Sequence, residues 1–321
     1  MNRPKKRKAP GDAREPPIKD PLSHDQSLDA VVRLFQRANH IVVVSGAGIS
    51  TNAGIPDFRS EGGIYSQLGH LKVDTPEDIF HIDFFNCDPQ PFYTFSKNLL
   101  SKTDWKPTLS HRFVKLLETR KKLLRMYTQN IDGLETAAGI SSSKLLQVHG
   151  SFASASCTAC RFKTSLESIK PYLERGQVFQ CPKCFQKKDG IVKPDIIFFG
   201  ENYSNKFQQC VNKDKPKVDL LVVMGSSLKI SPIAGIKNQF PAVPSILINK
   251  QELESKHAFD YILRGDSDVI VCYLCRQLGW DELAEGPREK EEDGVAEESE
   301  RPVLTSESES GQGRLIDFSF V

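Results

Sequence analysis

Two pairs of cysteines have the spacing that is usual for the ligands of a metal ion. Cys157 and Cys160 are separated by two residues, as are Cys181 and Cys184, and 20 residues lie between the pairs. Two such turns let four thiolates converge tetrahedrally on one Zn²⁺. Because four thiolates leave no position for water, the sequence predicts a structural zinc ion. The alternative is four free cysteines in a small core.

A third pair, Cys272 and Cys275, lies in an apolar segment with helical spacing. Buried cysteine behaves as a small hydrophobic residue, so we interpret both as core residues. Cys87 and Cys210 have no recognisable partner in the sequence, which indicates no role for them.

One of the seven histidines follows an apolar run, where a general base could act. His149 comes directly after Leu145-Leu146-Gln147-Val148 and precedes Gly150. A neutral imidazole at a strand end can accept a proton near physiological pH. His149 is therefore the candidate base, and a surface or core position is the better interpretation of the other six.

A glycine-rich turn follows a β-branched run near the start of the chain. Ile41-Val42-Val43-Val44 leads into Ser45-Gly46-Ala47-Gly48-Ile49-Ser50, with a further glycine at Gly54. A strand that enters such a turn and then a helix places backbone N–H groups against a phosphate. The spacing G-x-G-x5-G differs from the G-x-G-x-x-G of dehydrogenases. The turn favours a nucleotide site, and a tight connection without a ligand is the alternative.

The next loop carries groups suited to a dinucleotide. Asp57-Phe58-Arg59-Ser60 follows Pro56, which keeps the segment from being helical. Arg59 can pair with a diphosphate, and Phe58 can cover a flat ring.

These residues need a scaffold, and recurring apolar runs predict a parallel sheet. Such runs are typical of strands buried on both faces, and helical stretches alternate with them. We expect a doubly wound α/β fold, with a first helix capped near Ser27 and a last helix over 268–278. The expected strands lie at 41–44, 123–127, 220–224 and 245–248.

The net charge of +2 conceals a division along the chain. Residues 1–20 carry +4, residues 21–280 carry +7 and residues 281–321 carry −9. No apolar run approaches the ~20 residues of a membrane span, and no secretory signal is recognisable at the N-terminus. Membrane proteins and secreted disulfide scaffolds are therefore excluded.

Both ends of the chain carry signals of their own. Pro4-Lys5-Lys6-Arg7-Lys8 is typical of a nuclear localisation signal and predicts an import receptor as partner; a solvated end is the alternative. The acidic tail could bind basic partners or keep the chain soluble. Ile316, Phe318 and Phe320 alternate within 315–321, so we expect a strand that docks on an edge of the sheet.

The motifs together resemble the signature of the sirtuins, a family of NAD-dependent protein lysine deacylases. They occur in the family's order over about residues 27–280, and ordered motifs are more specific than any single one. Through His149-Gly150-Ser151-Phe152-Ala153 the chain is most similar to the nuclear class I branch, the sirtuin-1-like deacetylases. The matching segments are Gly46–Ser50, Gly54–Ser60, Tyr127–Asp132, His149-Gly150, Phe198–Glu201, Gly225–Leu228 and Ile248-Asn249.

This resemblance implies a catalytic domain over 25–283 with a smaller composite domain inserted in a Rossmann-like core. The core would comprise about 25–53, 120–150 and 193–283, the helical insertion 54–119 and the zinc module 151–192. The basic tail 1–24 and the acidic tail 284–321 would be mostly disordered.

The resemblance also implies roles for the site residues. His149 would be the general base, and Asn130 would act with it. The acyl oxygen of a modified lysine would attack C1′ of the nicotinamide ribose, so that NAD is consumed. Residues implied to bind NAD are Gly46, Ala47, Gly48, Ile49, Asp57, Phe58, Arg59, Tyr65, Gln129, Asn130, Ile131, Asp132, Gly225, Ser226, Ser227, Asn249, Lys250, Gln251 and Ser267. Residues implied to bind the substrate are Ile197, Phe199, Gly200, Glu201, Leu228 and Lys229.

The sequence thus predicts a nuclear NAD-dependent protein lysine deacetylase with one structural Zn²⁺. Its expected substrates are acetylated lysines in extended segments of histones and other nuclear proteins, bound by β-augmentation, with a role in chromatin silencing and transcription. We expect no sequence-specific nucleic-acid binding and no membrane contact. The alternatives are an NAD-linked oxidoreductase, another NAD-consuming activity such as protein ADP-ribosyl transfer or another deacylation, and a catalytically silent NAD- or histone-binding scaffold.

Overall fold

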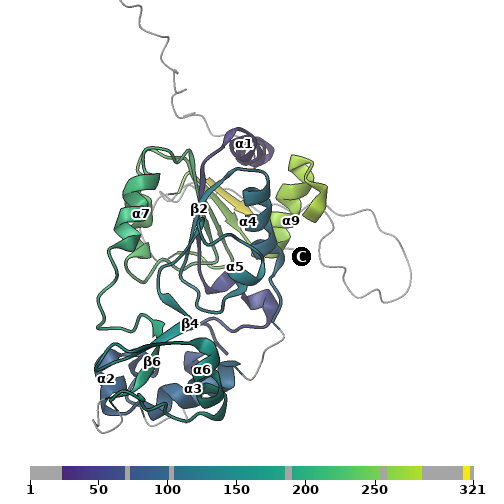
Figure 1. Ribbon diagram of the computed structural model, residues 1–321. Helices are drawn as coiled ribbons and strands as arrows, with labels where there is room; N and C mark the ends of the chain where they lie inside the picture. The colour runs from purple at the N-terminus through teal and green to yellow at the C-terminus, as the bar shows by residue number, and fades with distance from the viewer. Residues whose placement is uncertain are drawn as a thin grey trace, which may run out of the picture.

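The computed structural model describes residues 24–68, 73–100, 105–184, 190–253, 259–283 and 314–318. They form a large lobe, in which helices enclose a sheet, and a small lobe at one end of it (Figure 1). None of the described helices combines the length and the apolar character needed to cross a membrane.

A seven-stranded parallel sheet forms the centre of the large lobe, in the order β10-β9-β8-β7-β1-β2-β3. Alternate residues of its central strands pack into different apolar clusters, as Val42 and Val43 do, so these strands are buried on both faces. The strands are β1 Ile41–Ser45, β2 Leu123–Thr128, β3 Leu145–Gln147, β7 Leu220–Met224, β8 Ser245–Asn249, β9 Tyr261–Arg264 and β10 Arg314–Asp317.

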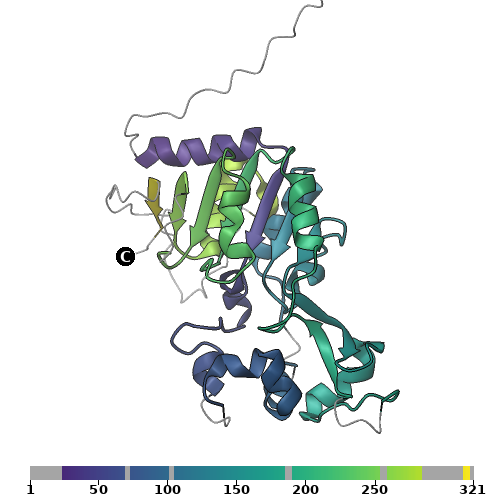
Figure 2. The same ribbon diagram turned by 90° about the vertical axis from the view of Figure 1, so that its left-hand side faces the viewer.

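Helices cover both faces of this sheet, which makes the large lobe a three-layered doubly wound domain (Figures 1 and 2). On one face pack α1 His24–Arg37, α4 Leu109–Thr119 and α9 Ser267–Leu278. On the other pack α7 Lys206–Asp214 and α8 Ile236–Gln239. The short helix α5, Leu134–Ala137, follows β2.

The small lobe is built from two separate stretches of the chain. An antiparallel sheet in the order β5-β4-β6 is accompanied by three helices and an aromatic core that includes Phe80, Phe85 and Phe92. Its elements are α2 Ile82–Cys87, α3 Gln90–Leu100, β4 Gly150–Cys157, β5 Lys163–Ser165, α6 Leu166–Arg175 and β6 Val192–Ile196.

The doubly wound fold predicted from the sequence is confirmed, but three local expectations differ from the structure. Helix α1 begins at His24, so Ser27 lies inside it and does not cap it. The glycine turn continues as two 3₁₀ turns, Ala47–Ile49 and Thr51–Ala53, instead of an α-helix. Helix α4 packs with α1 and α9 in the large lobe, so the helical insertion ends before it, earlier than residue 119.

The C-terminal segment forms an edge strand of the large sheet. β10 pairs in parallel with β9, and the side chains of Ile316 and Phe318 enter the core between α1 and α9. Phe320, the basic cluster Pro4–Lys8 and residues 284–313 lie outside the described residues.

Candidate functional site

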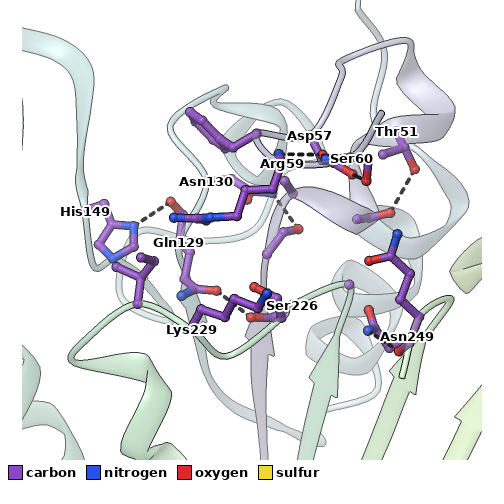
Figure 3. Close-up of a pocket in the computed structure, with 18 of the residues that line it drawn as sticks. Thr51, Asp57, Arg59, Ser60, Gln129, Asn130, His149, Ser226, Lys229 and Asn249 are labelled. Atoms are coloured by element: carbon purple, nitrogen blue, oxygen red, sulfur yellow. Dashed lines mark hydrogen bonds between the residues drawn. The ribbon is translucent and has the colours of Figure 1, made fainter. Parts of the chain in front are cut away.

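A cavity of about 660 Å³ lies where the carboxyl ends of the parallel strands face the small lobe. Residues that directly follow β1, β2, β7 and β9 line it on the large-lobe side, together with the end of β8 (Figure 3). Such a position, outside the carboxyl ends of the strands, is where doubly wound folds bind ligands.

The glycine turn after β1 packs directly against the turn after β7. The Gly46 N–H donates to the Met224 carbonyl at 3.0 Å, and the Gly48 N–H donates to the Gly225 carbonyl at 2.9 Å. A Cβ on Gly46 would lie 2.6 Å from the Gly225 oxygen. Gly225 has φ +57°, and a Cβ there would lie 2.5 Å from the Ile49 nitrogen. The glycines are therefore required for the two turns to approach each other beside the cavity.

The loop after the 3₁₀ turns is organised by one carboxylate. Asp57 Oδ1 accepts the N–H groups of Arg59 at 2.9 Å and Ser60 at 2.7 Å, and its Oδ2 accepts the Ser60 hydroxyl. This holds Phe58 and Arg59 in the cavity wall. The Arg59 guanidinium lies 5.6 Å from the centre of the Tyr65 ring. A cation thus stands at a wall that also contains aromatic rings.

Two amide side chains after β2 are oriented by the surrounding backbone and hydroxyls. Asn130 Nδ2 donates to the Gly46 carbonyl at 3.1 Å and to Ser50 Oγ at 3.2 Å, which leaves its Oδ1 as the remaining acceptor. Gln129 Oε1 accepts the Ser226 hydroxyl at 2.6 Å. Both side chains line the cavity in fixed orientations (Figure 3).

His149 presents an unpaired nitrogen at the cavity. Its Nδ1 lies 3.0 Å from the Gln129 carbonyl, which can only accept a hydrogen bond, so Nδ1 carries the proton. Its Nε2 is buried and has no partner among the described residues. Burial lowers the pKa of His149, although the carbonyls of Gln129 and Ser231 oppose this shift. The side chain is therefore neutral at pH 7, with the lone pair of Nε2 available for a proton.

The segment after β6 lines the cavity from the small lobe, but its backbone is largely paired. The Ile197 N–H donates to the His149 carbonyl at 2.8 Å, and the Phe199 N–H donates to the Phe80 carbonyl at 2.8 Å. The Phe199 carbonyl accepts the Ile82 N–H at 2.9 Å. An extended peptide therefore cannot pair with the backbone of Phe199, so residues 197–201 do not form a continuous free edge for the substrate.

The four predicted metal ligands converge in the small lobe, at the end of β4 away from the cavity. Their sulfur atoms lie within 4.8 Å of one another, with Cys157 and Cys184 at 3.5 Å and Cys160 and Cys181 at 3.7 Å. None of the four forms a disulfide. With Zn–S bonds of about 2.3 Å, the edges of a tetrahedron measure about 3.8 Å. The sulfurs thus fit one tetrahedral zinc ion, and no ligand position remains for water.

The model of the Sir2 family matches residues 46–232, from the glycine turn to the segment after β7. The chain belongs to the Sir2 family. The resemblance to sirtuins seen in the sequence is therefore confirmed.

Named relatives cover most of the chain. It is 44% identical over 269 residues to the NAD-dependent protein deacetylase sirtuin-1 of Mus musculus, and the aligned region covers 83% of this chain and 36% of the relative. It is 41% identical over 287 residues to the NAD-dependent histone deacetylase sirtuin-1 of Drosophila melanogaster, and the aligned region covers 82% of this chain and 34% of the relative. The NAD-dependent histone deacetylase SIR2 of Candida albicans is 44% identical over 261 residues, 79% of this chain and 50% of the relative. The chain thus spans about a third to a half of the length of these relatives.

Most residues that the family resemblance assigned to NAD and substrate meet at the cavity, and five do not. Ile49 and Leu228 are buried in cores, and Gly200 lies outside the lining. Asp132 lies behind the wall, and Glu201 binds Lys193 and the Phe198 N–H in the small lobe. The residues that do line the cavity are Gly46, Ala47, Gly48, Asp57, Phe58, Arg59, Tyr65, Gln129, Asn130, Ile131, His149, Ile197, Phe199, Gly225, Ser226, Ser227, Lys229, Asn249, Lys250, Gln251 and Ser267.

Several lining residues were missed from the sequence. Tyr203 is 38% exposed, and its ring centre lies 6.1 Å from that of His149. Asp266 Oδ1 accepts a hydrogen bond from Asn52 Nδ2 at 2.8 Å. Ser60, Phe198 and Ile248 belong to motifs already identified and could have been included, whereas no local pattern marks the others. The missed residues are Thr51, Ser60, Phe80, Ile196, Phe198, Tyr203, Ile230, Ile248, Glu252, Leu253, Gly265 and Asp266.

Proposed function

We propose that this chain is an NAD-dependent protein lysine deacetylase that uses His149 as its general base. One observation carries the proposal: a neutral histidine with an unpaired Nε2 stands in a cavity where hydrogen bonds hold the side chains of Gln129 and Asn130 in place. The names of the relatives, NAD-dependent protein or histone deacetylases, support the same reaction.

The cavity residues suit the parts of NAD. The N–H groups of the glycines in the Gly46 and Gly225 turns are already paired, so other backbone groups of these turns and the guanidinium of Arg59 would hold the diphosphate. Asn249, at the end of β8, and Ser267 would lie at the adenosine end. The orphaned Nε2 of His149 and the remaining acceptor of Asn130 mark the reacting end, because both need a hydroxyl or amide donor.

When bound, NAD supplies the ribose carbon from which nicotinamide departs and to which the acyl oxygen of lysine bonds. Arg59 then offsets the negative charge of the diphosphate, and Asn130 orients a hydrogen-bond donor of the ligand through its Oδ1. His149 accepts a proton at Nε2 while its Nδ1–H stays bonded to the Gln129 carbonyl, which keeps the ring in place and stabilises the charge that it gains. Apolar residues around it, such as Ile197 and Phe199, exclude water.

The substrate would be an acetylated lysine in an extended segment. Because the N–H groups of Phe199 and Glu201 are already paired, main-chain pairing would run through Gly200 and the residues after Glu201 on one side and through Lys229 on the other. Acetyl is the expected group, because Ile197 and Phe199 beside His149 are apolar and the one arginine that lines the cavity, Arg59, is assigned to the diphosphate. The proposed substrates are histones and other nuclear proteins. Pro4–Lys8 would bind an import receptor and direct the chain to the nucleus, where its role would be chromatin silencing.

One assay tests the function against its alternatives. The full chain is mixed with NAD and an acetyl-lysine peptide, and nicotinamide and deacetylated peptide are measured. We expect equal amounts of both, dependence on the peptide, and loss of both in His149→Ala. Nicotinamide release without the peptide would instead indicate glycohydrolase or ADP-ribosyl transfer, NADH formation would indicate an oxidoreductase, and binding of NAD without turnover would indicate a scaffold.

A further inference from the structure

The turn that carries Phe199 into the cavity wall is closed from both ends by one glutamate. The Glu201 N–H donates to the Phe198 carbonyl at 3.0 Å, and Glu201 Oε2 accepts the Phe198 N–H at 2.8 Å. Gly200 has φ +85°, the left-handed conformation in which glycine is favoured at the third position of a turn. The side chain of Glu201 thus folds back over its own turn. Phe198 and Phe199 line the cavity, whereas Glu201 does not.

A buried lysine holds this carboxylate. Lys193, on β6, is 6% exposed, and its Nζ donates to Glu201 Oε2 at 2.9 Å. The same nitrogen donates to the carbonyls of Ile196 at 2.6 Å and Pro194 at 3.2 Å, so its three protons are all used, and it lies 4.3 Å from the centre of the Phe198 ring. One ammonium group thus ties the end of β6 to the turn. We call these two residues the Lys193–Glu201 clamp.

The strand that carries Lys193 gives the clamp a fixed base. β6 pairs antiparallel with β4, where Val192 is the partner of Cys157. The Val192 N–H also donates to the Phe179 carbonyl at 3.0 Å, so β6 is held on both sides next to Lys193. Residues 197–201 lie beyond the end of this strand. The clamp therefore connects a well-anchored strand to the turn that follows it.

The hydrogen bonds of the clamp fix directions that an apolar contact would leave free. Apolar side chains of similar volume can stabilise a buried position as well as an ion pair does, because desolvation offsets the attraction between the charges. Charge-assisted hydrogen bonds add geometric specificity. Here they hold the Ile196 carbonyl and the Phe198 N–H, the two groups that flank Ile197. Because Ile197 lines the cavity, the clamp sets the orientation of the wall beside His149.

We propose that Lys193 and Glu201 are positioning residues for the peptide substrate: the clamp fixes the turn Phe198–Glu201, so that the backbone at Gly200 and after Glu201 meets the peptide in one register. This inference rests on the proposed function, which assigns that backbone to the acetylated segment. Without the clamp the turn would adopt several orientations, and the peptide would have to order it on binding. The clamp therefore acts on the affinity for the peptide and leaves the NAD end of the cavity unchanged.

Three variants separate positioning from stability. Glu201→Leu leaves the buried Lys193 charge unpaired and should lower Tm by about 6–20 °C, whereas Lys193→Met, which leaves the less buried Glu201 unpaired, should lower it less. The double variant removes both charges and keeps an apolar contact, so it should regain part of the lost Tm. Its KM for the peptide should nevertheless stay about ten- to a hundredfold above wild type, with the KM for NAD within about twofold. A double variant with the wild-type KM for the peptide would contradict the proposal.

Arg125→Met is the matched control, because it breaks a second buried ion pair that lies away from the cavity. Arg125 Nε lies 2.5 Å from Asp214 Oδ2, and Asp214 is 2% exposed. Neither residue lines the cavity. Arg125→Met should lower Tm to a similar extent as Glu201→Leu and keep the KM for the peptide within about twofold of wild type. An equal rise of that KM in Arg125→Met would show that lost stability alone weakens peptide binding, and it would overturn the proposal.

Hydrogen exchange tests the positioning without substrate or NAD. When exchange of the full chain is followed by mass spectrometry, residues 196–201 should exchange faster in the double variant than in wild type, and at the wild-type rate in Arg125→Met. Equal exchange of this segment in the double variant and in wild type would overturn the proposal, whatever the kinetics show. A wild type that does not deacetylate the peptide would contradict the proposed function instead, and the exchange result would still show whether the clamp fixes the turn.

Discussion

The C-terminal strand offers the sharpest test of how the large lobe is stabilised. Phe318, at the end of β10, is 2% exposed and packs edge-on against the Tyr273 ring of α9, with ring centres 5.4 Å apart. Its N–H donates to the Arg264 carbonyl at 2.7 Å. Its Cβ lies 2.9 Å from where a Cβ on Gly265 would stand, so the chain after β9 passes directly against it. We predict that Phe318→Ala destabilises the large lobe and loosens this turn.

The size of this destabilisation follows from the contacts of the Phe318 ring. Truncation of a fully buried phenylalanine costs about 3–5 kcal/mol, and the cavity left between α9 and the sheet cannot collapse easily at a strand end that is tied by its backbone. For a domain of this size, that loss lowers Tm by ~6–20 °C. Because Gly265 and Ser267 line the cavity, the KM for NAD should also rise, while the KM for the peptide should not.

Thermal and urea unfolding of the full chain measure the first effect, and initial rates measure the second. Leu315→Ala is the matched control, since Leu315 lies on the same strand, is only half-buried and alternates to the other face. Leu315→Ala should lower the free energy of unfolding clearly less than Phe318→Ala does. Equal stability of Phe318→Ala and wild type would refute the reasoning, because it would mean that β10 is not held against β9 in solution.

Three further predictions concern the site and the small lobe. Cys181→Ser should remove the single zinc ion per chain, measured by elemental analysis, and unfold the small lobe, because three thiolates cannot complete the tetrahedron; retained zinc would contradict this. Gly225→Ala should cost about 1–3 kcal/mol in unfolding from its left-handed φ alone, and more from the contact with Ile49, and it should abolish NAD binding measured by calorimetry. The acidic limb of the kcat/KM profile should lie below the ordinary pKa of histidine, because His149 is neutral only above its lowered pKa; a limb above that value would exclude it as the base.

Local patterns predicted the parts of the fold that depend on periodicity and spacing. The strands β1, β7 and β8 contain continuous β-branched or apolar runs, and β2 is a similar run interrupted by Arg125; burial on both faces favours such runs. The convergence of four cysteines follows from two short turns whose geometry is local. In both cases the physical constraint lies within a few residues, so the sequence reveals it.

Features that depend on packing between distant segments were not visible in the sequence. The helix Leu109–Thr119 has an amphipathic pattern that fits either lobe, and only its contacts with α1 and α9 place it in the large one. Tyr203 joins the cavity because the loop after Glu201 turns toward His149, which no periodicity signals. The pairing of Phe199 with residues 80–82 likewise joins segments more than a hundred residues apart.

The site combines fixed polar side chains with one that is left unpaired. Asp57 is occupied by its own loop, Gln129 by Ser226, and Asn130 by Gly46 and Ser50, so little reorganisation is needed when a ligand enters. Fixed dipoles of this kind stabilise developing charge more effectively than mobile ones, since their ordering cost is met during folding. The lone pair of His149 Nε2 is the exception, and it faces the ligand.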